Sequence, residues 1–139
     1  MTTHMKLDDT IVNVNIKIAS LWTSVMFITI YLDYFHLYMP NAIEDIMKGR
    51  VYVFDISQGF LLAALAMVAT PALMIFLSVT LSAKINRLLN IIIAAINIPL
   101  ILFNLAGEAW LHMVLGAMIQ VILLSLIIYY AWKWQSVES

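Results

Sequence analysis

The sequence predicts an all-α integral membrane protein, a single transmembrane domain over residues 1–139 that folds as an up-down-up-down bundle of four helices. Apolar residues make up 64% of the chain and charged residues 11%, with a mean hydropathy of +0.98. A soluble domain has nearly half apolar and about a quarter charged residues. A chain of this length cannot enclose so many apolar side chains, so lipid must cover them.

The apolar residues also gather in four runs, each long enough to cross a bilayer. About 20 helical residues, rising about 1.5 Å each, span about 30 Å of hydrocarbon. Every backbone polar group in lipid must be paired within its own segment, so these runs are predicted to be helices. Their ranges are 16–35, 56–81, 87–105 and 108–132.

The first helix follows a polar lead that contains Lys6 and Asp8. The lead has no short apolar region ending in a small-residue cleavage pattern, so we expect a retained span and not a cleaved signal peptide. The later connections are short, at about 82–86 and 106–107, which predicts antiparallel neighbours for helices two to four.

An outer loop is predicted at residues 36–55, between the first two helices. Pro40 should end the first helix, and Asn41 with Glu44 forms a capping-box pattern for a short helix that Gly49 ends. Residues 50–54 are predicted to be extended or interfacial. Asp55, followed three residues later by Gln58, is a second capping pattern that should start the second long helix.

The basic residues are distributed unevenly between the two predicted faces of the membrane. Five lie on the side of both termini and two on the side of the outer loop, which predicts cytoplasmic termini by the positive-inside rule. The first group is Lys6, Lys17, Lys84, Arg87 and Lys133; the second is Lys48 and Arg50.

Several functional classes are disfavoured by composition. The chain has no cysteine, so thiolate metal sites and disulfide chemistry are excluded. A net charge of -1 gives no basic excess for nucleic acid. The chain lacks a Gly-rich phosphate loop, H-E-x-x-H and G-x-S-x-G. We therefore assign no catalytic residue, predict no cofactor, and favour a non-enzymatic function.

One candidate metal site lies at the outer ends of the first and last helices. Asp33 and His36 are spaced i, i+3, and Glu108 and His112 are spaced i, i+4, so each pair shares a helix face. If the two pairs meet, they suit zinc, iron or manganese, or form an unliganded network that handles protons or a ligand. The main alternative is that all four lie at the headgroup level. A haem held by the two histidines is disfavoured because both are near the surface.

A polar layer near the middle of the membrane offers a second candidate site, formed by Thr70, Asn97 and Gln120. Polar side chains at this depth face the bundle interior. They can line the cavity of a small-molecule transporter or ligand-binding protein, or they can join helices at about 0.6 kcal/mol per hydrogen bond. The chain lacks the mid-span acidic residue of the four-span small multidrug exporters.

Three stretches carry a resemblance to a known family: LWTSVMF at residues 21–27, DYFHLYMP at 33–40 and YAWKW at 130–134. The chain resembles a family of small four-span bacterial membrane proteins classed as a domain of unknown function. The resemblance implies this architecture and no particular activity. We expect a bacterial inner-membrane protein whose partners are lipids and other copies of itself, with Tyr34, Tyr38 and Pro40 organising the outer end of the first helix.

Overall fold

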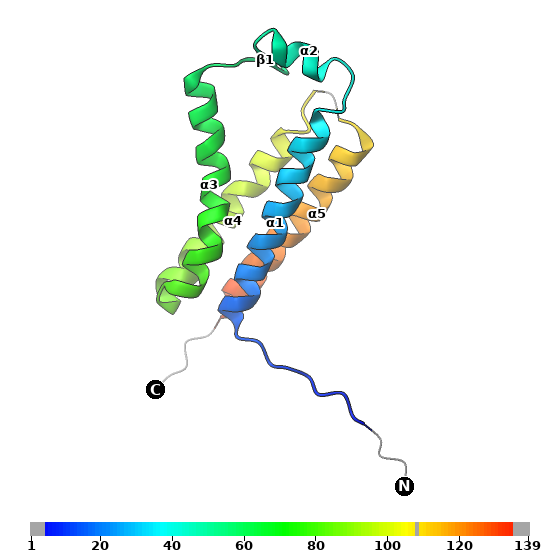
Figure 1. Cartoon of the computed structure of the whole chain (residues 1–139). Coiled ribbons are helices and arrows are strands. Elements are labelled where there is room, and N and C mark those ends of the chain that lie inside the picture. The colour runs from blue at the N-terminus through cyan, green and yellow to red at the C-terminus, as the bar shows by residue number, and fades with distance from the viewer. Residues whose placement is uncertain (1–4, 108, 135–139) are drawn as a thin grey trace.

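The computed structural model describes residues 5–107 and 109–134, and four long helices dominate it (Figure 1). All four are long and apolar enough to cross a membrane. The prediction of an all-α, four-span membrane protein is therefore confirmed. The long helices are α1 (Val14–His36), α3 (Gln58–Thr80), α4 (Ala83–Phe103) and α5 (Leu111–Lys133).

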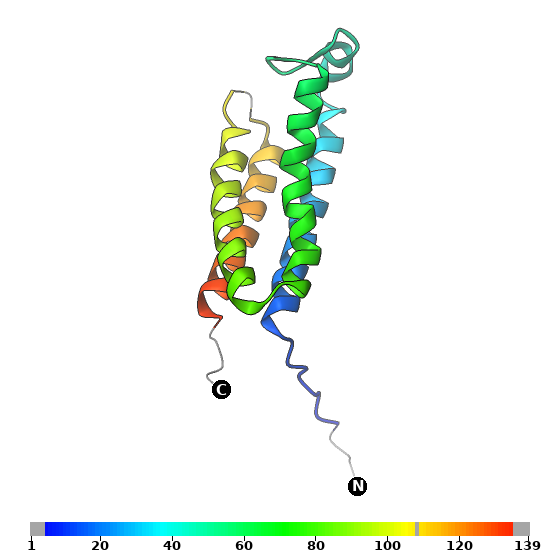
Figure 2. The same cartoon turned by 90° about the vertical axis from the view of Figure 1, so that its left-hand side faces the viewer.

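The helices run alternately up and down and form two layers, α1 with α3 and α4 with α5 (Figure 2). Helix α1 packs against both α3 and α5, and α4 packs against α5. The contact between α3 and α4 is much smaller. These two helices meet near their connecting turn and separate toward the opposite end (Figure 2). We call the end that holds this turn the terminal end, because α1 starts and α5 ends there, and the other the loop end.

Helix α4 begins at Ala83, four residues before the predicted start at residue 87. Its N-cap is Ser82, which has an extended backbone. The first turns of α4 therefore contain Lys84 and Asn86, which we had expected in a connection. This earlier start makes Asn86 one of the buried residues of α4.

The loop between α1 and α3 has its own structure, with helix α2 (Ala42–Met47) followed by a hairpin of β1 (Arg50–Val51) and β2 (Phe54–Asp55). Gly49, at a φ of 83°, stands between the helix and the hairpin and tolerates this left-handed conformation because it has no Cβ. Asn41 is the N-cap of α2, but its side chain makes no capping hydrogen bond.

The predicted cap of the second long helix is wrong. Ser57 is the N-cap of α3, and its Oγ accepts a hydrogen bond from the Phe60 amide at 3.0 Å. Asp55 instead belongs to β2, where its carboxylate lies 3.7 Å from Nε of Arg50 across the hairpin. The serine competes successfully because it stands immediately before the helix.

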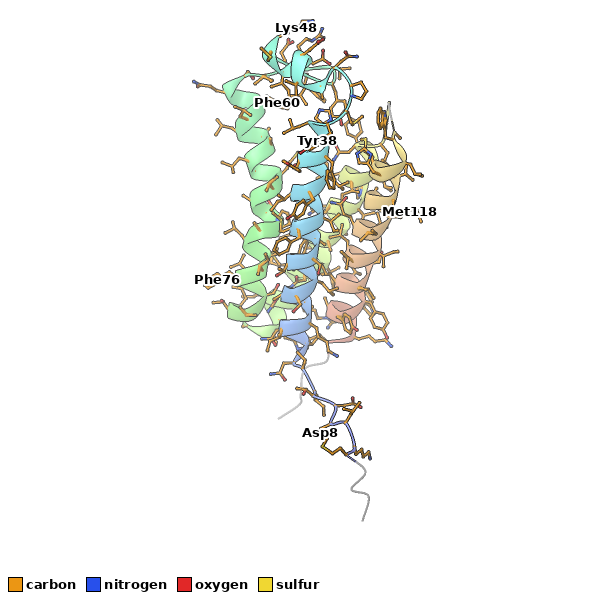
Figure 3. All side chains as sticks on the ribbon, turned by 45° about the vertical axis from the view of Figure 1, so that its right-hand side comes forward. Asp8, Tyr38, Lys48, Phe60, Phe76 and Met118 are labelled. Carbon is orange, nitrogen blue, oxygen red and sulfur yellow. The ribbon has the colours of Figure 1, made fainter. Side chains whose placement is uncertain are left out.

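The apolar core lies in the terminal half of the bundle, where all four helices contribute to it. Large apolar side chains outside this core point outward along the helices, such as Phe76 of α3 and Met118 of α5 (Figure 3). Such a surface is stable in lipid and not in water. The buried members of the core are Ile18, Trp22, Val25, Met74, Ala94, Leu124, Ile127 and Ala131.

Candidate functional site

The best-defined polar feature is a network buried inside this core, which we call the asparagine network: Trp22 of α1, Ser78 of α3, and Asn86 and Asn90 of α4. All four residues are at most 1% exposed. Nε1 of Trp22 donates a hydrogen bond to Oδ1 of Asn90 at 2.6 Å, and Oγ of Ser78 donates to the same oxygen at 3.3 Å. One amide oxygen thus joins three helices.

The amide groups of the two asparagines complete the network. Nδ2 of Asn90 donates to Oδ1 of Asn86 at 2.6 Å and to its main-chain oxygen at 2.8 Å. Nδ2 of Asn86 donates to the main-chain oxygen of Ser78 at 2.5 Å. Every member is neutral at ordinary pH, so the network suits helix association better than proton transfer or metal binding.

Sequence analysis did not identify this network. The predicted helix begins only at residue 87, so Asn86 falls in a connection, and the prediction does not include Asn90 among the polar residues of the interior. A usable signal was present: Asn86, Asn90, Ala94 and Asn97 are spaced i, i+4, i+8 and i+11, which places them on one face of a helix.

The three residues of the predicted mid-membrane layer have different surroundings. Gln120 is buried, and its Nε2 donates to Oγ1 of Thr29 at 2.8 Å, which joins α5 to α1. Asn97 is half-buried and donates to the main-chain oxygen of Ile93 in its own helix. Thr70 is exposed and donates to Ala66 of its own helix. Among the residues that the structure describes, no hydrogen bond joins any of these three side chains to another.

Helices α1 and α5 come especially close next to Gln120. A Cβ atom built on Gly116 would lie 2.6 Å from Cδ2 of Leu32 and 3.1 Å from its Cγ. Because Gly116 has no side chain, Leu32 of α1 packs directly against the backbone of α5. Small residues commonly permit such close packing in membrane helices.

The three described residues of the predicted metal site, Asp33, His36 and His112, lie at the loop end. Nδ1 of His36 lies 3.0 Å from the hydroxyl of Tyr52, and the two ring centroids are 4.5 Å apart. Asp33 is exposed on α1. Residues 5–107 and 109–134 contain no group of three or more potential metal ligands, and Glu108 lies outside these described residues.

His112 is the most unusual of these residues. Its Nε2 is buried and has no hydrogen-bond partner within the described part of the chain. The residue lines an apolar groove of about 170 Å³ between α1 and α5, together with Tyr31, Phe35 and Leu115. An imidazole nitrogen without a partner in such a place costs free energy unless something binds it.

Two tyrosines at the end of α1 contact one another. The hydroxyls of Tyr34 and Tyr38 are 2.7 Å apart, and the rings meet edge to face with centroids at 5.3 Å. The hydrogen bond with Tyr34 raises the pKa of Tyr38, and desolvation adds to the shift. Pro40 follows at the bend that leads to α2, next to the buried Met39.

These features define a small, four-span membrane protein with a hydrogen-bonded interior. Residues 5–139 match the family of unknown function DUF6326, and the chain belongs to that family. The resemblance found in the sequence is thereby confirmed. Comparisons with curated proteins and with solved structures found no match.

Proposed function

We propose that this protein is a non-enzymatic component of the bacterial inner membrane, a helical bundle that acts by associating with other membrane components. The supporting observation is that its buried polar side chains are used in bonds between helices. Asn90 and Gln120 each join α4 or α5 to α1. Side chains engaged in this way stabilise the bundle and are not free to hold a substrate.

The test compares two polar residues at similar depth. Gln120→Leu removes a bond between helices, whereas Asn97→Leu removes a bond within one helix. We expect the first variant to lose about 0.6 kcal/mol of unfolding free energy in mild detergent and the second to lose less. A transporter with its site in this layer would give a different result. Both variants would keep the stability of the wild type, and both would lose transport of a solute.

The distribution of charge supports cytoplasmic termini. Lys17, Lys84, Arg87 and Lys133 all belong to the terminal end, where α1 begins, α4 begins and α5 ends. Basic residues are retained on the cytoplasmic side during insertion. A cytoplasmic reporter fused to the C-terminus should be active, and an active periplasmic reporter at that position would contradict this orientation.

The association surface we propose is the outward face of α3, through which copies of the chain would pair. Helix α3 is the least buried of the four spans: 11% of its most apolar stretch is buried, against 28% for α1. Cross-linking through a cysteine placed at Phe76, which is 63% exposed, should give dimers. A cysteine at Met118 of α5 provides the control, and equal cross-linking from both positions would contradict a specific α3 interface.

A metal-binding function is the second candidate, and the observation that favours it is the buried Nε2 of His112, which has no hydrogen-bond partner among the described residues. Elemental analysis of the protein purified in mild detergent tests it. About one zinc, iron or manganese per chain, lost in His112→Ala, would support a site that includes Asp33, His36 and Glu108. Metal-free protein would leave the helical bundle as the better interpretation.

A further inference from the structure

A groove of about 430 Å³ lies between α1 and α5 near the terminal end of the bundle. Its lining combines a lysine and two serines with apolar and aromatic side chains. Lys17 stands three residues after the start of α1, so the charged part of the groove is near the membrane surface. The residues that matter are Lys17, Ser20, Leu21 and Ser24 of α1 with Leu126 and Tyr130 of α5.

The spacing of these residues produces a continuous groove. Those on α1 are related by i, i+3, i+4 and i+7, and those on α5 by i, i+4, so each set occupies one helix face. Seven residues of helix extend about 10 Å. The groove therefore leads from a cation at headgroup depth to a hydroxyl deeper in the membrane, with apolar walls between them.

Lys17 is available to an anion. Its side chain is exposed, and its Nζ lies 5.4 Å from the ring centroid of Tyr130. The one ion pair within the described residues joins Arg50 to Asp55 at the opposite end of the bundle, so it does not involve Lys17. Arg87, by comparison, already donates to the main-chain oxygen of Trp132.

The hydroxyl of Ser24 is free to donate a hydrogen bond to a ligand. The other serine and threonine hydroxyls of the four spans donate to an oxygen: Ser20 and Ser125, for example, each donate to the carbonyl four residues earlier. Ser24, although it lies in the same helix as Ser20, has no hydrogen bond in the described part of the chain. A hydroxyl without a partner in hydrocarbon is unfavourable, so a ligand that accepts its hydrogen bond is stabilised there.

We propose that this groove binds a phospholipid with an anionic headgroup, taken from the membrane that surrounds the protein. The phosphate pairs with Lys17, the acyl chains lie against Leu21 and Leu126, and the hydroxyl of Ser24 donates to a glycerol ester carbonyl. Basic pockets between membrane helices bind anionic headgroups in this way. The proposal requires only that the chain spans a membrane, so it can fail while the proposed orientation and function hold.

The test uses the full chain in mild detergent, with native mass spectrometry to count bound phosphatidylglycerol and phosphatidylcholine. Lys17→Gln should lower phosphatidylglycerol affinity about five-fold and leave phosphatidylcholine unchanged. Lys17→Arg should keep the preference for phosphatidylglycerol over phosphatidylcholine, because it keeps the positive charge. Lys84→Gln, an exposed lysine at the same end and outside the groove, is the matched control and should have no effect at moderate salt.

Ser24→Ala gives an independent second measurement, because both lipids have ester carbonyls. It should lower the affinity for both lipids about two- to ten-fold. Ser125→Ala, which loses a hydrogen bond within its own helix, should change neither affinity. An equal loss in Lys84→Gln and Lys17→Gln would overturn the proposal, since the attraction would then be diffuse. Complete displacement of phosphatidylglycerol by inorganic phosphate would also overturn it, because the groove would then be an anion site without selectivity for lipid.

Discussion

Asn90 uses all the hydrogen-bonding capacity of its side chain. A primary amide has two acceptor positions and two donor hydrogens. Oδ1 accepts from Trp22 and Ser78, and Nδ2 donates twice to Asn86. A buried amide that is satisfied in this way favours one arrangement of helices over others, because any shift leaves a polar group unpaired in a low-dielectric interior.

The bond from Trp22 to Asn90 gives a prediction about stability. Trp22→Phe keeps a buried ring and removes the Nε1 donor. We expect the lost bond to lower the free energy of unfolding in a detergent titration by about 0.6 kcal/mol, with a further loss because the smaller ring leaves a cavity in the core. The control is Trp132→Phe, on an exposed side chain that keeps its ring beside Arg87. A stability equal to that of the wild type in both variants would show that the bond adds nothing.

The tyrosine pair at the end of α1 gives a prediction about pH. Tyr38 has a raised pKa because of its hydrogen bond with Tyr34, so the folded state favours the protonated phenol. This stabilisation is fully present below the ordinary tyrosine pKa of about 10 and is lost as the pH rises through the raised value. Tyr34→Phe should therefore lower the pKa of Tyr38.

Ring-carbon NMR of labelled tyrosine measures this pKa, with the Tyr38 signal assigned from Tyr38→Phe. Tyr31→Phe is the control, because Tyr31 contacts Phe35 and has no recorded contact with Tyr38. An unchanged pKa of Tyr38 in Tyr34→Phe would mean that the hydrogen bond does not persist in solution.

At the scale of elements, the spans were predictable from the sequence because lipid permits few alternatives. A run of about 20 apolar residues must be a helix, whatever its neighbours. The ends were less predictable, because a cap depends on local backbone geometry. Ser82 starts α4 without a side-chain capping bond, and this early start brought Asn86 into the helix.

The choice of partners between elements was not predictable from one sequence. Gln120 could bond to any helix that faces it, and the structure selects Thr29 of α1. The contact of His36 with Tyr52 depends on a hairpin turn in which Tyr52 has a φ of 53°, a conformation rare for a bulky residue. Neither periodicity nor charge indicates such a turn.

The close approach of α1 and α5 gives a prediction at this scale. Gly116→Ile should destabilise the bundle by about 1–3 kcal/mol, because the new side chain overlaps Leu32. Gly116→Ala should cost less, since the end of the Leu32 side chain can rotate away. Unfolding in detergent measures both.

Shortening Leu32 tests whether its overlap with the new side chain at position 116 causes the loss of stability. Leu32→Ala in the Gly116→Ile background should recover part of the lost stability, whereas Leu115→Ala, which removes an exposed leucine from α5, should not. Failure of Leu32→Ala to recover any stability would place the damage elsewhere.

At the scale of the whole molecule, an apolar surface surrounds a small polar interior. The core and the asparagine network both lie in the terminal half, where α3 and α4 meet. Toward the loop end these two helices separate (Figure 2). The terminal half is thus the more tightly joined part of the bundle, and the α2 segment and hairpin connect α1 to α3 at the other end.

This arrangement is most directly tested by labelling single cysteines in intact cells, since the chain has none of its own. Lys48→Cys, in the loop after α2, and Lys84→Cys, in the first turn of α4, lie at opposite ends of the bundle. A membrane-impermeant maleimide should label Lys48→Cys in intact cells and Lys84→Cys only after lysis. Labelling of both positions from the same side would contradict the four-span fold, and the reverse pattern would contradict cytoplasmic termini.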